Sequence, residues 1–339
     1  MTTVVTGASG HLGGNLVRAL LDRGDTVRVV VRDHGTDTAS LAGLDVERVV
    51  ADVRDEASMG VALAGAEVVF HLAAIISISG DRGGIVTDTN VRGVRTVARA
   101  ARAAGVRRMV HTSSIHAFLI SDHTRPIDET SPRAALPTSG AYDLSKAAGE
   151  VELRAVIADG LDAVIVNPTA IVGPNDFAPS RLGKVILQIG RGTLPSMISG
   201  GFDFVDVRDV VDGLLAAERR GRTGENYILG GHWHAFTELA AMVTQATGAA
   251  PPMLTTPTWL VHLGLPFVRA HAALVKREPL YTDESLAAAA ASRHIVHDKA
   301  RRELGHDPRP LAETIRDTCA WLDANGMLHA RPRAAERSA

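Results

Sequence analysis

This chain of 339 residues has a single cysteine, no long apolar run and no excess of positive charge. The single cysteine, Cys319, excludes an intramolecular disulfide and is typical of a reducing compartment. The longest apolar stretch, residues 259–268, is interrupted by polar and helix-breaking residues and is too short to span a membrane. Lysine and arginine number 36 against 38 acidic residues, which gives no basic surface for a nucleic acid. A strand begins at Thr2 and leaves no room for a signal peptide, so we expect a soluble cytoplasmic protein.

Histidine is plentiful, with 14 residues, but it lacks the spacing that metal sites need. His232 and His234 are two apart, and His294 and His297 are three apart. Neither pair has a third ligand at a recognisable distance, and there is no H-E-x-x-H motif. We therefore expect no metal site.

A glycine-rich turn opens the chain. Residues 3–7 form a short β-branched run, and Gly7, Gly10 and Gly13 follow the pattern G-x-x-G-x-x-G before an apolar helical stretch. In this context the first glycine permits a sharp turn, the second a close approach of the backbone to a pyrophosphate, and the third close packing of helix and strand. The helix N-terminus then faces the phosphates. The pattern predicts a dinucleotide site, with an ordinary glycine turn as the alternative.

Strand-like and helix-like segments alternate through the first half of the chain. Continuous apolar runs of this length are typical of parallel strands that are buried on both faces. They lie at residues 27–31, 46–50, 68–72, 109–112 and 163–166, with helical patterns at 12–23, 55–64, 84–104 and 139–158. This alternation predicts an α/β fold, a Rossmann-type doubly wound parallel sheet with the cofactor at the carboxyl ends of its strands.

The pattern changes after Pro168. A strand is expected at 204–207 and a helix at 210–219, and beyond 236 the pattern is mostly helical, including an alanine run at 287–291. We expect a dinucleotide-binding domain of residues 1–168 plus about 203–232. A smaller, mostly helical substrate domain takes 169–202 and 233–328, followed by a flexible tail at 329–339.

Tyr142 and Lys146 are four residues apart in a helical stretch, so their side chains share one face. Lysine occurs at only four positions and tyrosine at only three, which makes this spacing informative. A nearby ammonium lowers the pKa of a tyrosine, which then exchanges a proton with a substrate oxygen. Ser113 and Ser114 end the run 109–112, where a hydroxyl can position a reacting oxygen. The alternatives are a surface tyrosine over a lysine stem and a serine turn.

Taken together, these motifs resemble the extended short-chain dehydrogenases/reductases over about residues 2–325. Segments 299–305 and Trp321 are similar to the branch with dihydroflavonol reductases and 3β-hydroxysteroid dehydrogenases. The resemblance implies cofactor-binding residues Gly7, Ser9, Gly10, His11, Leu12, Gly13, Asp52, Val53, Leu72, Ala73, Ala74, Tyr142, Lys146, Pro168 and Thr169. Segments 173–174 and 207–210 match further family motifs.

The resemblance also gives roles to the catalytic residues. Tyr142 is the general acid in reduction, Lys146 lowers its pKa and holds the nicotinamide ribose, and Ser114 orients the carbonyl. Asn90 supports the helix and a proton relay. Ser114 rather than Ser113 has the family spacing. Members of the family often dimerise through the tyrosine helix and its neighbour, so a homodimer is expected.

The cofactor and substrate are less closely defined by the sequence. Arg32 follows the second strand, where a guanidinium accommodates a 2′-phosphate, so NADP is preferred to NAD. Asp33 leaves NAD possible. The apolar segments 75–76 and 115–120 predict a hydrophobic ketone or secondary alcohol, unless they are core. His116 is either a substrate contact or, more simply, a solvent-facing loop residue.

Three functions remain open at this point. The first is an NADP-dependent alcohol dehydrogenase or carbonyl reductase. The second is a sugar-nucleotide epimerase or dehydratase that retains NAD. The third is a non-catalytic nucleotide sensor, which has no need of Tyr142 and Lys146.

Overall fold

The computed structural model describes residues 1–33, 39–120, 125–194, 196–252, 254–256, 286, 289 and 294–329. The apolar stretch 259–268, most of the alanine run 287–291 and the tail from 330 lie outside the described residues. Within the described part of the chain, no helix has the length and apolar character needed to cross a membrane.

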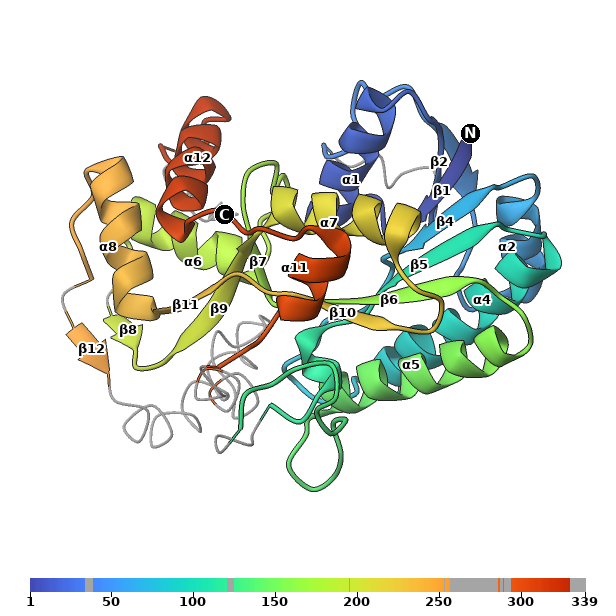
Figure 1. Ribbon diagram of the computed structural model, residues 1–339. Helices are drawn as coiled ribbons and strands as arrows, with labels where there is room; N and C mark the ends of the chain where they lie inside the picture. The colour runs from blue at the N-terminus through green and yellow to red at the C-terminus, as the bar shows by residue number, and fades with distance from the viewer. Residues whose placement is uncertain are drawn as a thin grey trace, which may run out of the picture.

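A seven-stranded parallel sheet forms the larger part of the molecule (Figure 1). Its strands are β1 (Thr2–Thr6), β2 (Thr26–Val31), β3 (Glu47–Val50), β4 (Val68–His71), β5 (Arg108–Thr112), β6 (Ala163–Pro168) and β10 (Asn226–Leu229). Their order is β10-β6-β5-β4-β1-β2-β3. The direction of winding therefore reverses between β1 and β4, the position where such sheets bind ligands at their carboxyl edge. The doubly wound sheet and its predicted strands are confirmed.

Helices cover both faces of this sheet because its strands are apolar on both sides (Figure 1). Val5, on β1, belongs to the core cluster beneath α1 (His11–Asp22) and α7 (Val207–Arg220). Its neighbour Val4 belongs to the opposite cluster. Three helices cover that face, namely α2 (Glu56–Leu63), α4 (Gly93–Ala103) and α5 (Ala141–Ala158).

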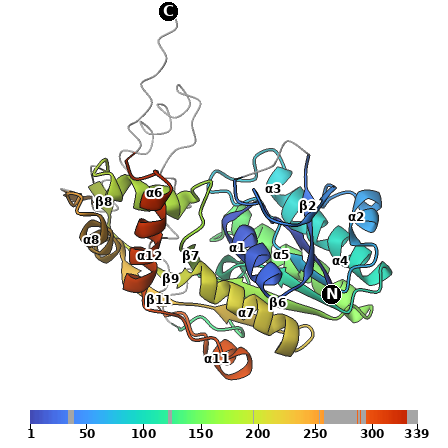
Figure 2. The same ribbon diagram turned by 90° about the horizontal axis from the view of Figure 1, so that it is seen from above.

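The smaller part of the molecule lies at one end of the large sheet. Figure 2 shows its helices together at that end, away from α2 and α4. They are α6 (Arg181–Gly190), α8 (Phe236–Thr247) and α12 (Leu311–Ala324). They pack on a sheet of β7 (Ala170–Val172), β9 (Gly201–Asp206) and β11 (His232–Ala235), beside a pair formed by β8 (Ser196–Ile198) and β12 (Leu254–Thr256). The short helix α11 (Asp298–Leu304) then returns to β10. The domain boundaries expected from sequence stay a prediction.

The segment predicted as a helix at 84–104 is helical over residues 85–103, but a π-helical turn interrupts its regular period. The segment divides into α3 (Ile85–Thr87), a π-helical turn η1 (Asp88–Arg92) and α4. Asn90 sits in the π turn and is buried. A π turn contains one residue more than a regular helical turn, and such turns are frequent at functional sites. The 3.6-residue spacing of apolar residues in the sequence does not reveal this extra residue.

Candidate active site

The glycine loop forms a cradle at the switch point between β1 and β4. Gly7 has φ +72°, and a Cβ there would lie 2.7 Å from Ala73 N. A Cβ on Gly13 would lie 2.2 Å from Gly7 O. Gly10 differs, since its Cβ would meet nothing closer than Gly7 O at 3.4 Å. The chain itself therefore requires Gly7 and Gly13, whereas the space at Gly10 fits the approach of an outside phosphate.

Other expected cofactor residues border this loop. Leu72, Ala73 and Ala74 are half-buried where β4 ends, and the Ala73 N–H donates to Thr6 Oγ1 at 3.3 Å. His11 Nε2 lies 2.9 Å from the carbonyl oxygen of Pro174. The loop after β1 is thus joined to the segment after β7. The sequence did not single out Thr6, although it stands at the end of the same strand.

The charged residues expected at the adenosine end come together beside β2. Arg32 and Asp33 are exposed directly after this strand. Asp52 forms an ion pair with Arg54 at 2.6 Å, and the pKa of its carboxyl is lowered by this hydrogen bond, with a smaller contribution from Arg32. The Asp52 carboxylate is therefore already paired within the chain. Its contact with an adenine, and that of the neighbouring Val53, stay predictions.

Helix α5 brings Tyr142 and Lys146 to the carboxyl end of β5. Lys146 is 4% exposed, and its Nζ donates to Thr112 O at 3.1 Å. Burial lowers the pKa of Lys146 to about 8, and the Glu150 carboxylate opposes this change. Burial raises the pKa of Tyr142 to about 12, against a hydrogen bond from Ser114 that lowers it. The net direction is opposite to the expected one, because loss of solvent outweighs the interaction with Ser114, and the lowering of the Tyr142 pKa by Lys146 stays a prediction.

The structure brings Ser114, rather than Ser113, to the tyrosine. Ser114 lies close enough to Tyr142 to lower the pKa of its phenol, and its Oγ accepts the N–H of His116 at 3.2 Å. Ser113 is buried, and its hydroxyl has no hydrogen-bond partner among the described residues. Pro168 ends the adjacent strand β6, and Thr169 follows it, buried.

Asn90 supports the helix that carries the tyrosine. Its Oδ1 accepts the N–H of Ile75 at 2.8 Å, and its Nδ2 donates to Ser145 Oγ at 3.0 Å. Ser145 in turn donates to the carbonyl oxygen of Tyr142 at 2.7 Å. Asn90 therefore joins the end of β4 to the turn of α5 between tyrosine and lysine.

Comparison with known proteins agrees with this geometry. The sequence profile of the NAD dependent epimerase/dehydratase family matches residues 3–230. The chain belongs to this family. Its members are NAD(P)-dependent oxidoreductases and epimerases that act on alcohol and ketone groups, and they are extended short-chain dehydrogenases/reductases, as the motifs predicted.

Two curated relatives and one solved structure illustrate the range of this family. Sterol demethylase protein B of Methylococcus capsulatus is 39% identical over 97% of this chain and 100% of its own. A 4-hydroxy-2-methyl-3-oxo-4-farnesyl-3,4-dihydroquinoline-1-oxide ketoreductase of Stigmatella aurantiaca is 31% identical over 91% of this chain and 92% of its own. The crystal structure of gox2253 superimposes with a TM-score of 0.83 at 35% identity, over 96% of this chain and 99% of that one.

A buried polar network behind α5 was not predicted from the sequence. Asn167, on β6, donates from Nδ2 to Ser114 O at 2.9 Å and to Glu150 Oε1 at 2.8 Å. Asn226, on β10, donates to Glu150 Oε2 at 3.1 Å and to Asn167 Oδ1 at 2.7 Å. The network connects the serine segment with the residue one turn after Lys146. The spacing of Lys146 and Glu150 was the only available signal.

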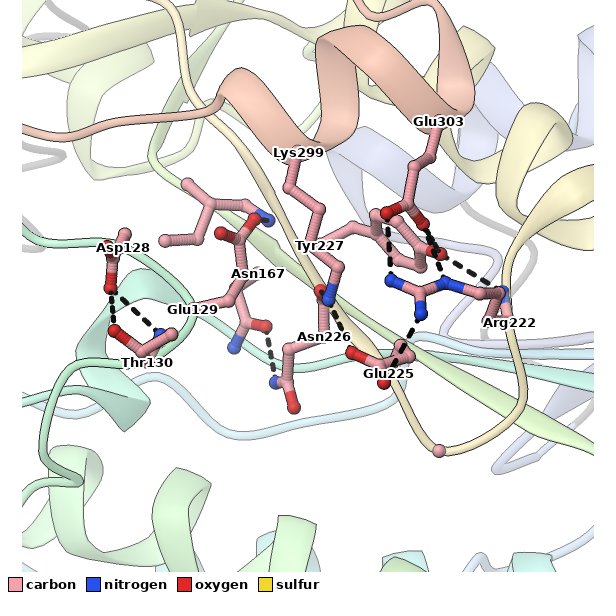
Figure 3. A network of polar contacts seen from close by, with 12 residues as sticks. Asp128, Glu129, Thr130, Asn167, Arg222, Glu225, Asn226, Tyr227, Lys299 and Glu303 are labelled. Carbon is pink, nitrogen blue, oxygen red and sulfur yellow. Dashed lines mark hydrogen bonds and ion pairs between the residues drawn. The ribbon is translucent and has the colours of Figure 1, made fainter.

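Helix α11 anchors the outer end of this network (Figure 3). Lys299 donates to Glu225 Oε2 at 2.6 Å and to Asn226 O at 2.7 Å. One turn later, Glu303 accepts the hydroxyl of Tyr227 at 2.6 Å. The C-terminal segment that resembled a family motif therefore fixes the edge strand that carries Asn226.

The rim of the site differs in two ways from what the sequence predicts. His116 is only partly exposed, because its Nδ1 lies 2.8 Å from Asp143 Oδ1 while 27% of its side chain faces solvent, and its contact with a substrate stays a prediction. Within the apolar segment 115–120, Ile115 and Phe118 pack in the core with Ile127 and Ile228 instead of facing a ligand. Apolar side chains are usually buried in the core, and the sequence does not show whether such a residue packs against other elements or against a ligand.

Proposed function

We propose that this protein is an NADP(H)-dependent oxidoreductase that interconverts a ketone and a secondary alcohol on a hydrophobic small molecule. The observation that carries the proposal is the meeting of Tyr142, Ser114 and the buried Lys146 at the end of β5, beside the glycine cradle. Within a fold that binds a nicotinamide dinucleotide, this combination supplies a proton donor, an orienting hydroxyl and a fixed cation.

Tyr142 is the proposed general acid. With its pKa at about 12, it keeps its proton at neutral pH and can donate it to a substrate oxygen that gains negative charge. Ser114, which lies beside the tyrosine, orients the same oxygen. Lys146 is charged below a pKa of about 8 and stabilises negative charge on the phenol oxygen once the proton has left. A bound nicotinamide would supply or accept the hydride.

The cofactor would be held by the loop from Gly7 to Gly13 and by the segment 72–74, which border the same cradle. Arg32, exposed after β2, is the proposed partner of a 2′-phosphate and the reason to prefer NADP over NAD. Asp33 beside it is the reason to keep NAD as an alternative.

The proposed substrate is hydrophobic and has several rings. Ile76 is 60% exposed and Ile75 half-buried, directly after the segment that borders the cradle. The names of the two relatives refer to a sterol and to a farnesylated quinoline oxide, both large apolar molecules. Burial of apolar surface contributes roughly 25 cal/mol per Å², so such a substrate gains affinity from an apolar rim.

Two further proposals complete this function. The chain forms a homodimer through α4 and α5, the arrangement that the resemblance to its family implies. The protein works in the cytoplasm, because the one cysteine, Cys319, is free and buried.

The experiment is a panel of hydrophobic ketones and secondary alcohols with NADPH and NADH, followed by absorbance of the reduced nicotinamide. We expect steady NADPH oxidation, and a loss of roughly a hundredfold to ten-thousandfold in kcat for Tyr142→Phe with unchanged cofactor affinity. Thr193→Val, which removes an exposed hydroxyl in the smaller part of the molecule, is the control. Full activity of Tyr142→Phe would exclude the mechanism. NAD that stays bound through purification, without net turnover, would favour an epimerase or dehydratase instead.

A further inference from the structure

The side chain of His116 lies beside the proposed catalytic tyrosine. Residues Ile115–Ala117 form a short 3-10 turn, η2, whose N-cap is Ser114. Because the His116 N–H donates to Ser114 Oγ, the turn is tied to the hydroxyl that orients the reacting oxygen. The imidazole lies edge-on to the Tyr142 ring, with 5.6 Å between the ring centroids. These contacts place His116 at the reacting end of the site.

Asp143 fixes the orientation of this imidazole and the tautomer of its neutral form. Its Oδ2 accepts the N–H of Gly140 at 3.2 Å, in the first turn of α5, where the helix dipole stabilises a carboxylate. Its Oδ1 lies 2.8 Å from His116 Nδ1. A carboxylate only accepts hydrogen bonds, so the proton of the neutral imidazole stands on Nδ1 and Nε2 is left as an acceptor.

The acceptor nitrogen is available to a ligand. Across the described ranges, no protein group donates a hydrogen bond to His116 Nε2, and the side chain is 27% exposed. Ile115 and Ala117, on either side, are buried in the protein. The turn therefore presents a polar nitrogen next to Tyr142, with its apolar side chains directed inward.

We propose that His116 Nε2 accepts a hydrogen bond from a hydroxyl that the substrate carries close to its reacting carbon, so that hydroxy ketones are preferred to simple ketones. This inference rests on the proposed function, in which Tyr142 and Ser114 donate to the ketone oxygen. The ketone oxygen accepts hydrogen bonds, whereas the neighbouring substrate hydroxyl has a proton to donate, and Nε2 is the acceptor for it. His116 is a binding residue here and takes no proton during the reaction.

The test compares two ketones that differ by one hydroxyl, tetralone and its derivative with a hydroxyl on the carbon beside the carbonyl, with NADPH as reductant. For the wild type we expect a kcat/KM about tenfold or more higher for the hydroxy ketone. His116→Ala should bring this ratio close to one, mainly through KM. His116→Gln retains an acceptor and should restore part of the preference. Asp143→Asn, whose amide can donate to Nδ1, should reduce the preference as well.

His234 provides a matched control, because it repeats the same pairing elsewhere. Its Nδ1 lies 3.0 Å from Glu238 Oε2, which also accepts the N–H of Ala235 at the start of α8 in the smaller part of the molecule (Figure 1). His234→Ala should keep the wild-type ratio. An unchanged ratio in His116→Ala, with normal thermal unfolding, or a wild type that does not distinguish the two ketones, would overturn the inference and leave the proposed function standing. Turnover of no ketone in this pair or in the wider panel would overturn the proposed function, and the inference with it.

Discussion

Asn226 and Glu150 are joined by a buried hydrogen bond of 3.1 Å across 76 residues of chain, between the edge strand β10 and helix α5. Both side chains are almost fully buried, at 3% and 1% exposure. The same amide of Asn226 also donates to Asn167, which holds the carbonyl of Ser114. One edge-strand residue thus supports both the serine segment and the helix with the tyrosine and lysine.

Replacement of Asn226 by leucine should destabilise the protein strongly. Glu150 and Asn167 would each lose a partner, and an unsatisfied buried polar group costs about 1–3 kcal/mol, so we expect a loss of roughly 2–5 kcal/mol in the free energy of unfolding. Urea denaturation measures this loss. Thr223→Val, which removes an exposed hydrogen bond to Asp162, is the control and should cost less than about 1 kcal/mol. Equal losses in the two variants would contradict the role given to the network.

Lys146→Met should stabilise the protein while it abolishes activity. The pKa of Lys146 is about 8 in the folded chain, against an ordinary value of 10.5, so burial of its charge costs roughly 3 kcal/mol below pH 8. The lost hydrogen bond to Thr112 offsets about 1 kcal/mol of the gain. We therefore expect roughly 2 kcal/mol of added stability at pH 7.

The pH dependence of the free energy of unfolding tests whether the buried charge of Lys146 destabilises the protein. Between pH 8 and 10.5 the unfolded chain binds a proton at Lys146 that the folded chain has lost, so wild-type stability should rise with pH across this window. Lys146→Met should lack the rise, and Lys184→Met, at an exposed position on α6, should retain it. Denaturation curves at several pH values measure both. Parallel curves for the wild type and Lys146→Met would show that Lys146 does not titrate in this way.

Glu150→Gln should move the alkaline limb of the pH–rate profile to lower pH. Burial is the larger effect and lowers the pKa of Lys146, whereas the Glu150 carboxylate raises it. Replacement of this carboxylate by a neutral amide therefore lets the pKa of Lys146 fall further. If activity requires charged Lys146, it is then lost earlier as pH rises. Glu152→Gln removes a more exposed carboxylate from the same helix, paired with Arg95 at 3.6 Å, and should leave the limb in place. The measurement is kcat against pH; a limb that does not move in Glu150→Gln would exclude this coupling.

Substitutions of two glycines in the first loop should have different effects, one on folding and the other on cofactor binding. Gly13→Ala places a Cβ 2.2 Å from Gly7 O and should lower the free energy of unfolding by about 1–3 kcal/mol, as overpacked sites do. Gly10→Ala meets no protein atom closer than 3.4 Å and should fold normally, yet bind NADP at least about tenfold more weakly. Thermal unfolding and fluorescence titration measure the two effects. Unaltered NADP affinity in Gly10→Ala would place the phosphates elsewhere.

Arg32→Ala should weaken NADP and spare NAD. A charge-assisted hydrogen bond to phosphate contributes about 1.5–3 kcal/mol, which is roughly tenfold or more in Kd. Arg99→Ala, exposed on α4, is the control. Tighter binding of NAD than of NADP by the wild type, with no response to Arg32→Ala, would reverse the cofactor assignment.

The sheet, the glycine turn and the shared face of Tyr142 and Lys146 could all be predicted from the order of the residues. Each depends on residues close together in the chain, where strand alternation, helical period and glycine spacing act directly on local conformation. The same local reasoning could not see the π turn at Asn90, since an extra residue in a helix is held by contacts with β4 and α5.

The residues that support and border the site could not be predicted in this way, because their contacts depend on how the elements pack together. Asn226 meets Glu150, and His116 meets Asp143, through bonds between elements that the chain order leaves far apart. Burial likewise reversed the expected direction of the Tyr142 pKa, because desolvation depends on everything packed around the phenol. Sequence specifies which groups are present, but their partners and their solvent are set by the fold.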